Sequence, residues 1–171
     1  MKDVIVLAMH GAPPRDFPRP ELAEFMSLHA RLESGSVSHS PAVESRYEEL
    51  EKKMRDWPRT GENDPFYSSS CQMAAALERV TWREVMLGFN EFCNPSLSEA
   101  LKRAAFSGAG RVFIVTPMMT RGGEHSEKDI LEAVNRIRTE HPAVKFIYAW
   151  PFETDEVAEF LAEHIKRFEN A

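Results

Sequence analysis

The stretch Asp3-Val4-Ile5-Val6-Leu7-Ala8-Met9 decides the fold, because it is continuously apolar after its first residue. Three of its side chains are β-branched, and a Gly-Ala-Pro-Pro breaker follows at 11–14. Apolar runs of this length are typical of strands that are buried on both faces of a parallel sheet. Stretches at 85–89, 111–116 and 144–150 repeat the pattern. We therefore expect four parallel strands.

Helical patterns alternate with these strands. They cover 95–105 and 126–141, the second with Ser126 as its N-cap, and a last helix is expected to start at a Thr154 cap. Strands that alternate with helices indicate a parallel sheet with helices on both faces. The predicted fold class is therefore α/β, a four-stranded parallel sheet flanked by helices, in a single domain over 1–171.

The stretch from 17 to about 61 does not follow this alternation. It contains two expected helices, at 21–32 and 42–57, and a third helix at about 66–79 leads into the second strand. A crossover between parallel strands needs only one helix. We interpret about 17–61 as a helical insertion after the first strand.

Composition narrows the class of protein. The net charge of −6, from 21 basic and 27 acidic residues, argues against nucleic acid as a partner. Cys71 and Cys93 are too few for a disulfide framework and too far apart for a CxxC pair, which fits a reducing cytoplasm. No run approaches the roughly 18 apolar residues that cross a bilayer, so no membrane partner is expected.

Three chemically active side chains directly follow strands. Ligands of open parallel sheets bind outside the carboxyl ends of the strands, where His10, Glu91 and His125 are expected. His10 could instead bond to the backbone, and Glu91 could be a solvent-facing carboxylate near a helix N-terminus. The Gly122-Gly123-Glu124-His125 loop could be a helix cap with surface charges. The position on one sheet edge favours a shared site.

Asp129 lies four residues after His125 and so shares its helical face, where a carboxylate can orient a metal-binding imidazole. The remaining histidines have no partner at ligand spacing in the sequence, and we assign no role to His29, His39, His141 or His164. No Gly-x-Gly-x-x-Gly, P-loop or Gly-x-Ser-x-Gly motif occurs, so no nucleotide cofactor is expected.

Together these loops resemble the class II chelatases, specifically the short sirohydrochlorin cobaltochelatases and ferrochelatases of the CbiX type. The similarity rests on residues 4–11, on 88–100, and most of all on 111–130 with its Pro-x-x-x-x-Gly-Gly-x-His-x-x-x-Asp-Ile run. It covers the first dozen residues and the chain from Phe66 onward.

The resemblance implies a cytoplasmic lyase that inserts a divalent metal into sirohydrochlorin or a related tetrapyrrole in cobalamin or siroheme biosynthesis. Co²⁺ is the first expectation for this metal substrate, with Fe²⁺ or Ni²⁺ as alternatives. The family's two metal-binding histidines correspond to His10 and His125, and its frequent third acidic residue corresponds to Glu91. These three would carry both metal binding and catalysis.

Sirohydrochlorin carries many carboxylates, and basic side chains on the loop rims are natural partners for them: Arg15, Arg121 and Lys128. Two departures from the family stand out. Ala12 replaces the family's serine, and the 17–61 segment is absent from the short members, which pair as homodimers. The insertion could cover the cleft, alter the dimer or replace it.

Two other functions stay open at this point. A non-catalytic tetrapyrrole- or metal-binding protein could use the same fold and the same histidines. A metal-dependent hydrolase would need more carboxylate or histidine ligands than the sequence places near the strand ends.

Overall fold

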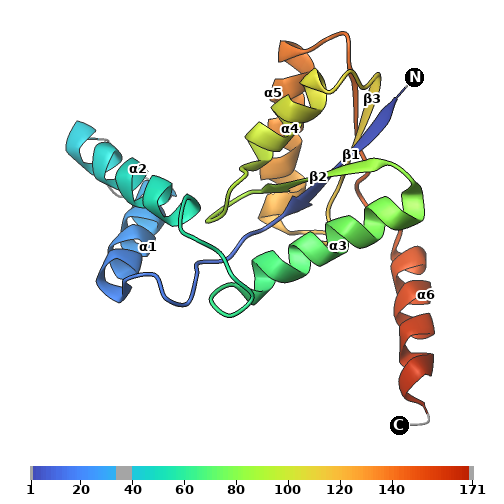
Figure 1. The fold of residues 1–171 in the computed structure, drawn as a ribbon, viewed down its shortest axis with the longest axis horizontal. Helices are drawn as coiled ribbons and strands as arrows, with labels where there is room; N and C mark the ends of the chain where they lie inside the picture. Colours follow the sequence, from blue (N-terminus) through green and yellow to red (C-terminus); the bar gives the residue numbers. More distant parts are fainter. Residues whose placement is uncertain (1, 34–39, 170–171) are drawn as a thin grey trace.

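The computed structural model describes residues 2–33 and 40–169. Its four strands form one wholly parallel sheet in the order β2-β1-β3-β4, and the first three strands are labelled in Figure 1. The strands are β1 (Asp3–Met9), β2 (Glu84–Phe89), β3 (Arg111–Val115) and β4 (Lys145–Tyr148). Met9 pairs with Phe89 and Leu7 with Val115, so the carboxyl ends of three strands meet at one edge. The predicted four-stranded parallel sheet is confirmed.

The helices of the described chain alternate with the strands except before β2, where three follow one another. They are α1 (Arg19–Glu33), α2 (Pro41–Arg55), α3 (Pro65–Thr81), α4 (Leu97–Phe106), α5 (Ile130–Glu140) and α6 (Thr154–Ile165). A π-helical turn η1 (His125–Asp129) leads into α5, and a 3-10 turn η2 (Lys166–Phe168) follows α6. None of these helices is long and apolar enough to span a bilayer.

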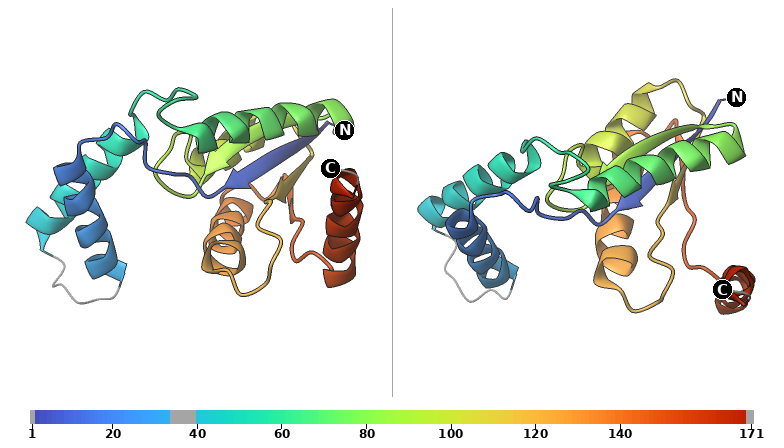
Figure 2. Two further views of the ribbon diagram at one scale, coloured as in Figure 1. Left: turned by 90° about the horizontal axis from the view of Figure 1, so that it is seen from below. Right: turned by 60° about the horizontal axis from the view of Figure 1, so that its bottom comes forward.

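Alternate side chains of the strands build two apolar cores, one on each face of the sheet. On one face Val6 and Ile114 pack with α4 and α5. On the other face Leu7 and Phe89 pack against α3. Figure 2 shows these helices on opposite sides of the sheet. Continuous apolar strands follow from this two-sided burial.

Helices α1 and α2 form a hairpin that projects beyond the carboxyl edge of the sheet (Figures 1 and 2). Leu50 and Met54 of α2 are fully buried in the second core. Phe25 of α1 is 3% exposed and meets the ring of Phe92 at 6.1 Å between centroids. The hairpin is therefore docked on the loop that follows β2, next to the strand ends.

Two expected helix caps are wrong. Ser126 lies inside the π-helical turn and donates its hydroxyl to the carbonyl of Gly123 at 3.1 Å. Thr154 is the first residue of α6, and Glu153 occupies the N-cap position without a side-chain bond. Helix α6 itself stands apart from the sheet in Figure 2, and its apolar side chains are largely exposed.

Candidate metal centre

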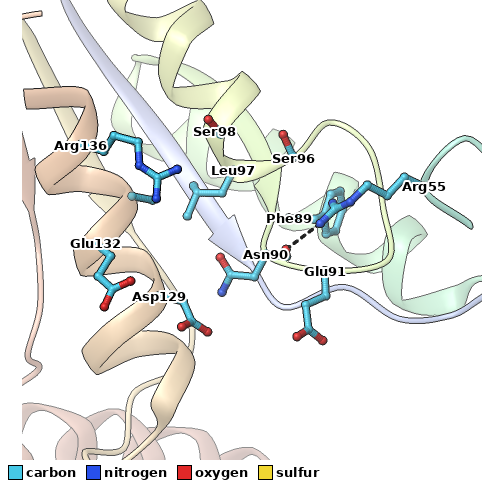
Figure 3. A pocket seen from close by; sticks show the side chains of 11 residues that line it. Arg55, Phe89, Asn90, Glu91, Ser96, Leu97, Ser98, Asp129, Glu132 and Arg136 are labelled. Carbon is cyan, nitrogen blue, oxygen red and sulfur yellow. Dashed lines mark hydrogen bonds between the residues drawn. The ribbon is translucent and has the colours of Figure 1, made fainter. Parts of the chain in front are cut away.

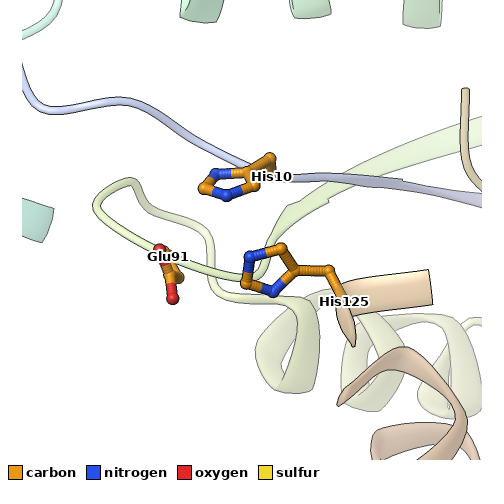
Figure 4. Close-up of side chains that lie close together, drawn as sticks. All are labelled: His10, Glu91 and His125. Carbon is orange, nitrogen blue, oxygen red and sulfur yellow. The ribbon is translucent and has the colours of Figure 1, made fainter. Parts of the chain in front are cut away.

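His10, Glu91 and His125 converge at the carboxyl edge of the sheet (Figure 4). His10 follows β1, Glu91 follows β2, and His125 begins the π-helical turn after β3. One potential ligand atom from each residue lies within 4.8 Å of the other two. The imidazole rings of the two histidines meet nearly at right angles, with centroids 4.3 Å apart. The fold therefore brings together the three residues that were expected at this edge, and their role as a shared metal site stays a prediction.

The spacing suits one divalent ion. Donors that bind an ion at roughly 2.1 Å lie about 3.0 Å apart when adjacent and about 4.2 Å apart when opposite. A set of donors within 4.8 Å of one another closes onto such an ion with side-chain movements of less than about 1 Å. Two imidazoles and a carboxylate form a donor set that accepts Co²⁺, Fe²⁺, Ni²⁺ or Zn²⁺, and three protein donors leave coordination positions free.

Hydrogen bonds at the Nδ1 atoms prepare both histidines for metal binding. Nδ1 of His10 lies 2.9 Å from the carbonyl oxygen of Gly11, and Nδ1 of His125 lies 2.7 Å from Oδ2 of Asp129. Carbonyl and carboxylate oxygens only accept, so each Nδ1 carries the hydrogen and donates it. The Nε2 lone pairs stay available for a metal. Asp129 occupies the orienting position expected for it.

The loops after β1 and β2 are joined through their backbones. The Asn90 amide donates to the Met9 carbonyl and the Glu91 amide to the His10 carbonyl, each at 2.9 Å. Gly11 has φ +104°, and a Cβ there would lie only 2.0 Å from the Glu91 carbonyl oxygen. This close approach requires glycine, and it fixes the separation of His10 from Glu91.

A buried ion pair binds the loops that follow β1 and β2. The side chains of Arg59 and Asp64 are 6% and 1% exposed and form a 2.5 Å ion pair. The Arg59 guanidinium also donates to the carbonyl oxygens of Ala12 and Phe92. No local sequence pattern marks this arginine, because its acceptors are loop carbonyls that only the folded chain brings together.

Tyr148 at the end of β4 supports the turn that carries His125. Its hydroxyl donates to the carbonyl of Ser126 at 2.7 Å. Burial raises the pKa of Tyr148 well above its usual value, so the phenol remains a donor throughout the physiological range. The sequence gives no signal for this role beyond an aromatic residue in a strand.

A pocket of about 300 Å³ lies beside Glu91, and Glu91 and Asp129 line its wall (Figure 3). Arg55 and Arg136 also line it, and the side-chain nitrogen of Asn90 is buried there without a hydrogen-bond partner. The volume is at the lower end for small-molecule sites.

The basic residues expected at the loop rims do not gather in this pocket. Arg15, Arg121 and Lys128 are exposed, and none of them lines it. Lys128 forms a 3.4 Å ion pair with Glu124. Their assignment to substrate carboxylates stays a prediction.

One of the histidines set aside in the sequence analysis does lie at the site. Nε2 of His29, on α1, lies 3.6 Å from Oε1 of Glu91, although His29 is not among the residues whose ligand atoms converge. His141 meets the ring of Phe106, away from the site, and His164 is on the exposed helix α6. His39 lies outside the described residues.

Comparison with known proteins gives the family. The family model described as CbiX matches residues 61–168, which is more than half of the chain and includes both Glu91 and His125. The chain belongs to the CbiX family. His10 and the α1–α2 hairpin lie before the matched region, so the geometry of the structure is what joins them to it.

Named relatives of this CbiX protein are chelatases. A sirohydrochlorin cobaltochelatase of Sulfurisphaera tokodaii is 36% identical over 83 residues, which are 48% of this chain and 65% of that protein. A sirohydrochlorin ferrochelatase of Priestia megaterium is 30% identical over 78 residues, 45% of this chain and 29% of that protein. The chain thus spans less than two thirds of each of these relatives.

Among solved structures, the cobalt complex of the sirohydrochlorin chelatase SirB from Bacillus subtilis subspecies spizizenii is similar with a TM-score of 0.48 and 17% identity. That likeness covers 98% of this chain and 51% of SirB. A CbiX protein from Marinobacter aquaeolei VT8 is similar with a TM-score of 0.45 and 17% identity, over 96% of this chain and 95% of that one.

Proposed function

We propose that this protein is a chelatase that inserts a divalent metal ion into sirohydrochlorin or a closely related tetrapyrrole. The observation that carries the proposal is the convergence of His10, Glu91 and His125 at the strand ends, with ligand atoms within 4.8 Å of one another. Membership of the CbiX family and the names of its relatives support the choice of reaction.

Metal insertion requires little covalent chemistry from the protein. The Nε2 atoms of His10 and His125 and the carboxylate of Glu91 hold the ion while it exchanges water for ring nitrogens. Imidazole and carboxylate donors bind it firmly enough to orient it and loosely enough to release it, unlike thiolates. Two pyrrole N–H protons must also leave the ring; once the ion has moved to the ring, Glu91 is free to accept one of them and a histidine or water the other.

We assign one part of the substrate to the pocket beside Glu91. This pocket would take one edge of the macrocycle or one of its carboxylate arms, with Arg136 as a charge partner. The exposed Arg15, Arg121 and Lys128 would bind further carboxylates at the rim. Co²⁺ is our first candidate metal and Fe²⁺ or Ni²⁺ the alternatives, since relatives named for cobalt and for iron are both similar to this chain.

We also expect the protein to act in the cytoplasm and to pair as a homodimer. The C-terminal helix supports the homodimer, because three large apolar side chains on α6 and the η2 turn expose more than half of their surface: Phe160, Ile165 and Phe168. Apolar side chains grouped in this way commonly mark an association surface. Light scattering coupled to gel filtration measures the mass directly, and a mass of one chain at micromolar concentration would contradict this expectation.

An anaerobic metallation assay tests the proposed reaction. Purified protein is mixed with sirohydrochlorin and Co²⁺, Fe²⁺ or Ni²⁺ in turn, and the absorption change of the macrocycle is followed against the protein-free rate. We expect acceleration with at least one metal and its loss in His10→Ala and His125→Ala, with His141→Ala as the matched control. Binding of sirohydrochlorin without faster metallation would favour a carrier instead.

A further inference from the structure

Helix α1 places a histidine against the carboxylate of the candidate metal centre. Nε2 of His29 lies 3.6 Å from Oε1 of Glu91, and both side chains are 22% exposed. Its other ring nitrogen, Nδ1, lies 3.1 Å from the hydroxyl of Tyr47 on α2. The two nitrogens of this ring thus link the hairpin to Glu91.

The position of His29 is fixed by stacked rings. The ring of Phe25 stacks on His29 at 5.9 Å and on Tyr47 at 5.1 Å between centroids, and His29 and Tyr47 are themselves nearly parallel. Phe25 also meets Phe92, which in turn stacks on His10 at 6.1 Å. A continuous set of aromatic contacts therefore runs from the hairpin to a metal-binding histidine.

The geometry decides between two roles for His29, that of a metal ligand and that of a residue that orients a metal ligand. Donors to one ion lie at most about 4.2 Å apart, and His29 is not a member of the group whose ligand atoms all fall within 4.8 Å of one another. It does contact the carboxylate of that group. A residue in this position orients a ligand without binding the ion.

We propose that His29 is a positioning residue for Glu91, supplied to the metal centre by the α1–α2 hairpin. With hydrogen on Nε2, the ring presents an N–H to the carboxylate, while the Tyr47 hydroxyl donates to Nδ1 and holds that tautomer. The carboxylate is thereby held facing His10 and His125. This inference rests on the proposed metal site and concerns how that site is built.

The test measures binding of Co²⁺ alone, without tetrapyrrole, by calorimetry and by the visible absorption of the bound ion. His29→Leu keeps the bulk of the side chain against Phe25 and removes the donor. We expect about tenfold weaker Co²⁺ binding, the lower range for partners of metal ligands. His29→Gln restores an N–H donor of similar reach and is expected to bind within about threefold of the unaltered protein. His164→Ala on exposed α6 is the matched control and should not change the affinity.

A double-mutant cycle decides whether the effect passes through Glu91. In a Glu91→Ala background, His29→Leu should cause no further loss of Co²⁺ affinity. A loss that persists there, or a His29→Leu protein that binds Co²⁺ as well as the unaltered one, overturns the inference. In metallation, His29→Leu should raise KM for Co²⁺ and leave KM for the tetrapyrrole unchanged.

Failure of the proposed function is recognised separately. A protein that binds Co²⁺ through these residues but never accelerates metallation refutes the chelatase and leaves the role of His29 standing. Thermal unfolding of His29→Leu and His29→Gln is recorded alongside. If the leucine variant is less stable than the glutamine variant, the comparison of His29→Gln with His29→Asn, whose donor is shorter in reach, gives the same answer, and equal Co²⁺ affinity of the two contradicts positioning.

Discussion

Because Gly11 lies against the backbone of Glu91, the addition of one methyl group at Gly11 should disturb the candidate metal centre. In Gly11→Ala the new Cβ would stand 2.0 Å from the Glu91 carbonyl oxygen, whereas real Cβ contacts are essentially never under 3.0 Å. The two loops must therefore separate by at least about 1 Å. That movement breaks the 2.9 Å bond from the Glu91 amide to the His10 carbonyl.

The cost follows from these two effects. Alanine at φ +104° stores strain of roughly 1–3 kcal/mol, and the lost backbone bond adds about 1 kcal/mol. We expect the free energy of unfolding to fall by about 3 kcal/mol, measured by urea denaturation. Displacement of His10 from Glu91 by about 1 Å should weaken Co²⁺ binding and slow metallation by roughly a hundredfold.

Gly108→Ala is the matched control for this substitution. Gly108 also has positive φ, at +77°, but an added Cβ would meet nothing within 4 Å. Its alanine variant carries strain alone, so stability should fall by about 1–2 kcal/mol while Co²⁺ affinity is unchanged. A Gly11→Ala protein with the stability of Gly108→Ala and full Co²⁺ affinity would refute the reasoning that backbone contact sets the site.

Three further predictions concern two supports of the site and the capping box of α4, in which the Glu99 carboxylate accepts from the Ser96 amide. Asp129→Ala frees the ring of His125 and should weaken Co²⁺ binding by about tenfold in calorimetry; unchanged affinity would contradict the orienting role. Tyr148→Phe removes the donor to the π-helical turn and should lower the free energy of unfolding in urea by about 1 kcal/mol. An unchanged free energy of unfolding would contradict the supporting role of this hydrogen bond. For Glu99, the hydrogen bond from the Ser96 amide lowers the carboxyl pKa, so its stabilisation exists above the usual value of 4.5 and disappears as pH falls through the lowered folded-state pKa. Glu99→Gln should therefore lower the free energy of unfolding by less than about 1 kcal/mol at pH 7 and leave it unchanged at a pH below the lowered pKa. An equal loss of unfolding free energy at both pH values would contradict this.

The sheet and the three convergent residues could be predicted from the sequence for one physical reason. Parallel strands place all their carboxyl ends on one edge, so residues such as His10 and His125 become neighbours despite a separation of more than a hundred positions. Buried strands of this kind can also be recognised in the sequence as continuous apolar runs.

The supports of the site could not be predicted in the same way. Ser126 has the residue type and place of an N-cap, but the chain forms a π-helical turn there, and Tyr148 from a distant strand bonds to that turn. His29 is one polar residue on a charged amphipathic helix, and such a residue usually faces water. Its contact with Glu91 depends on the docking of Phe25 against Phe92, which no local pattern encodes.

The loop after β1 is bound through its backbone at Ala12 by the segment that precedes α3. Here the Ala12 carbonyl accepts from Arg59 at 2.7 Å, and the same guanidinium binds the Phe92 carbonyl of the neighbouring loop. Arg59 lies between α2 and α3 and forms an ion pair with buried Asp64. The α1–α2 hairpin thus brings His29 to the Glu91 carboxylate, and the segment after it brings Arg59 to the loop backbones, so that residues before the family's matched region line the candidate metal centre.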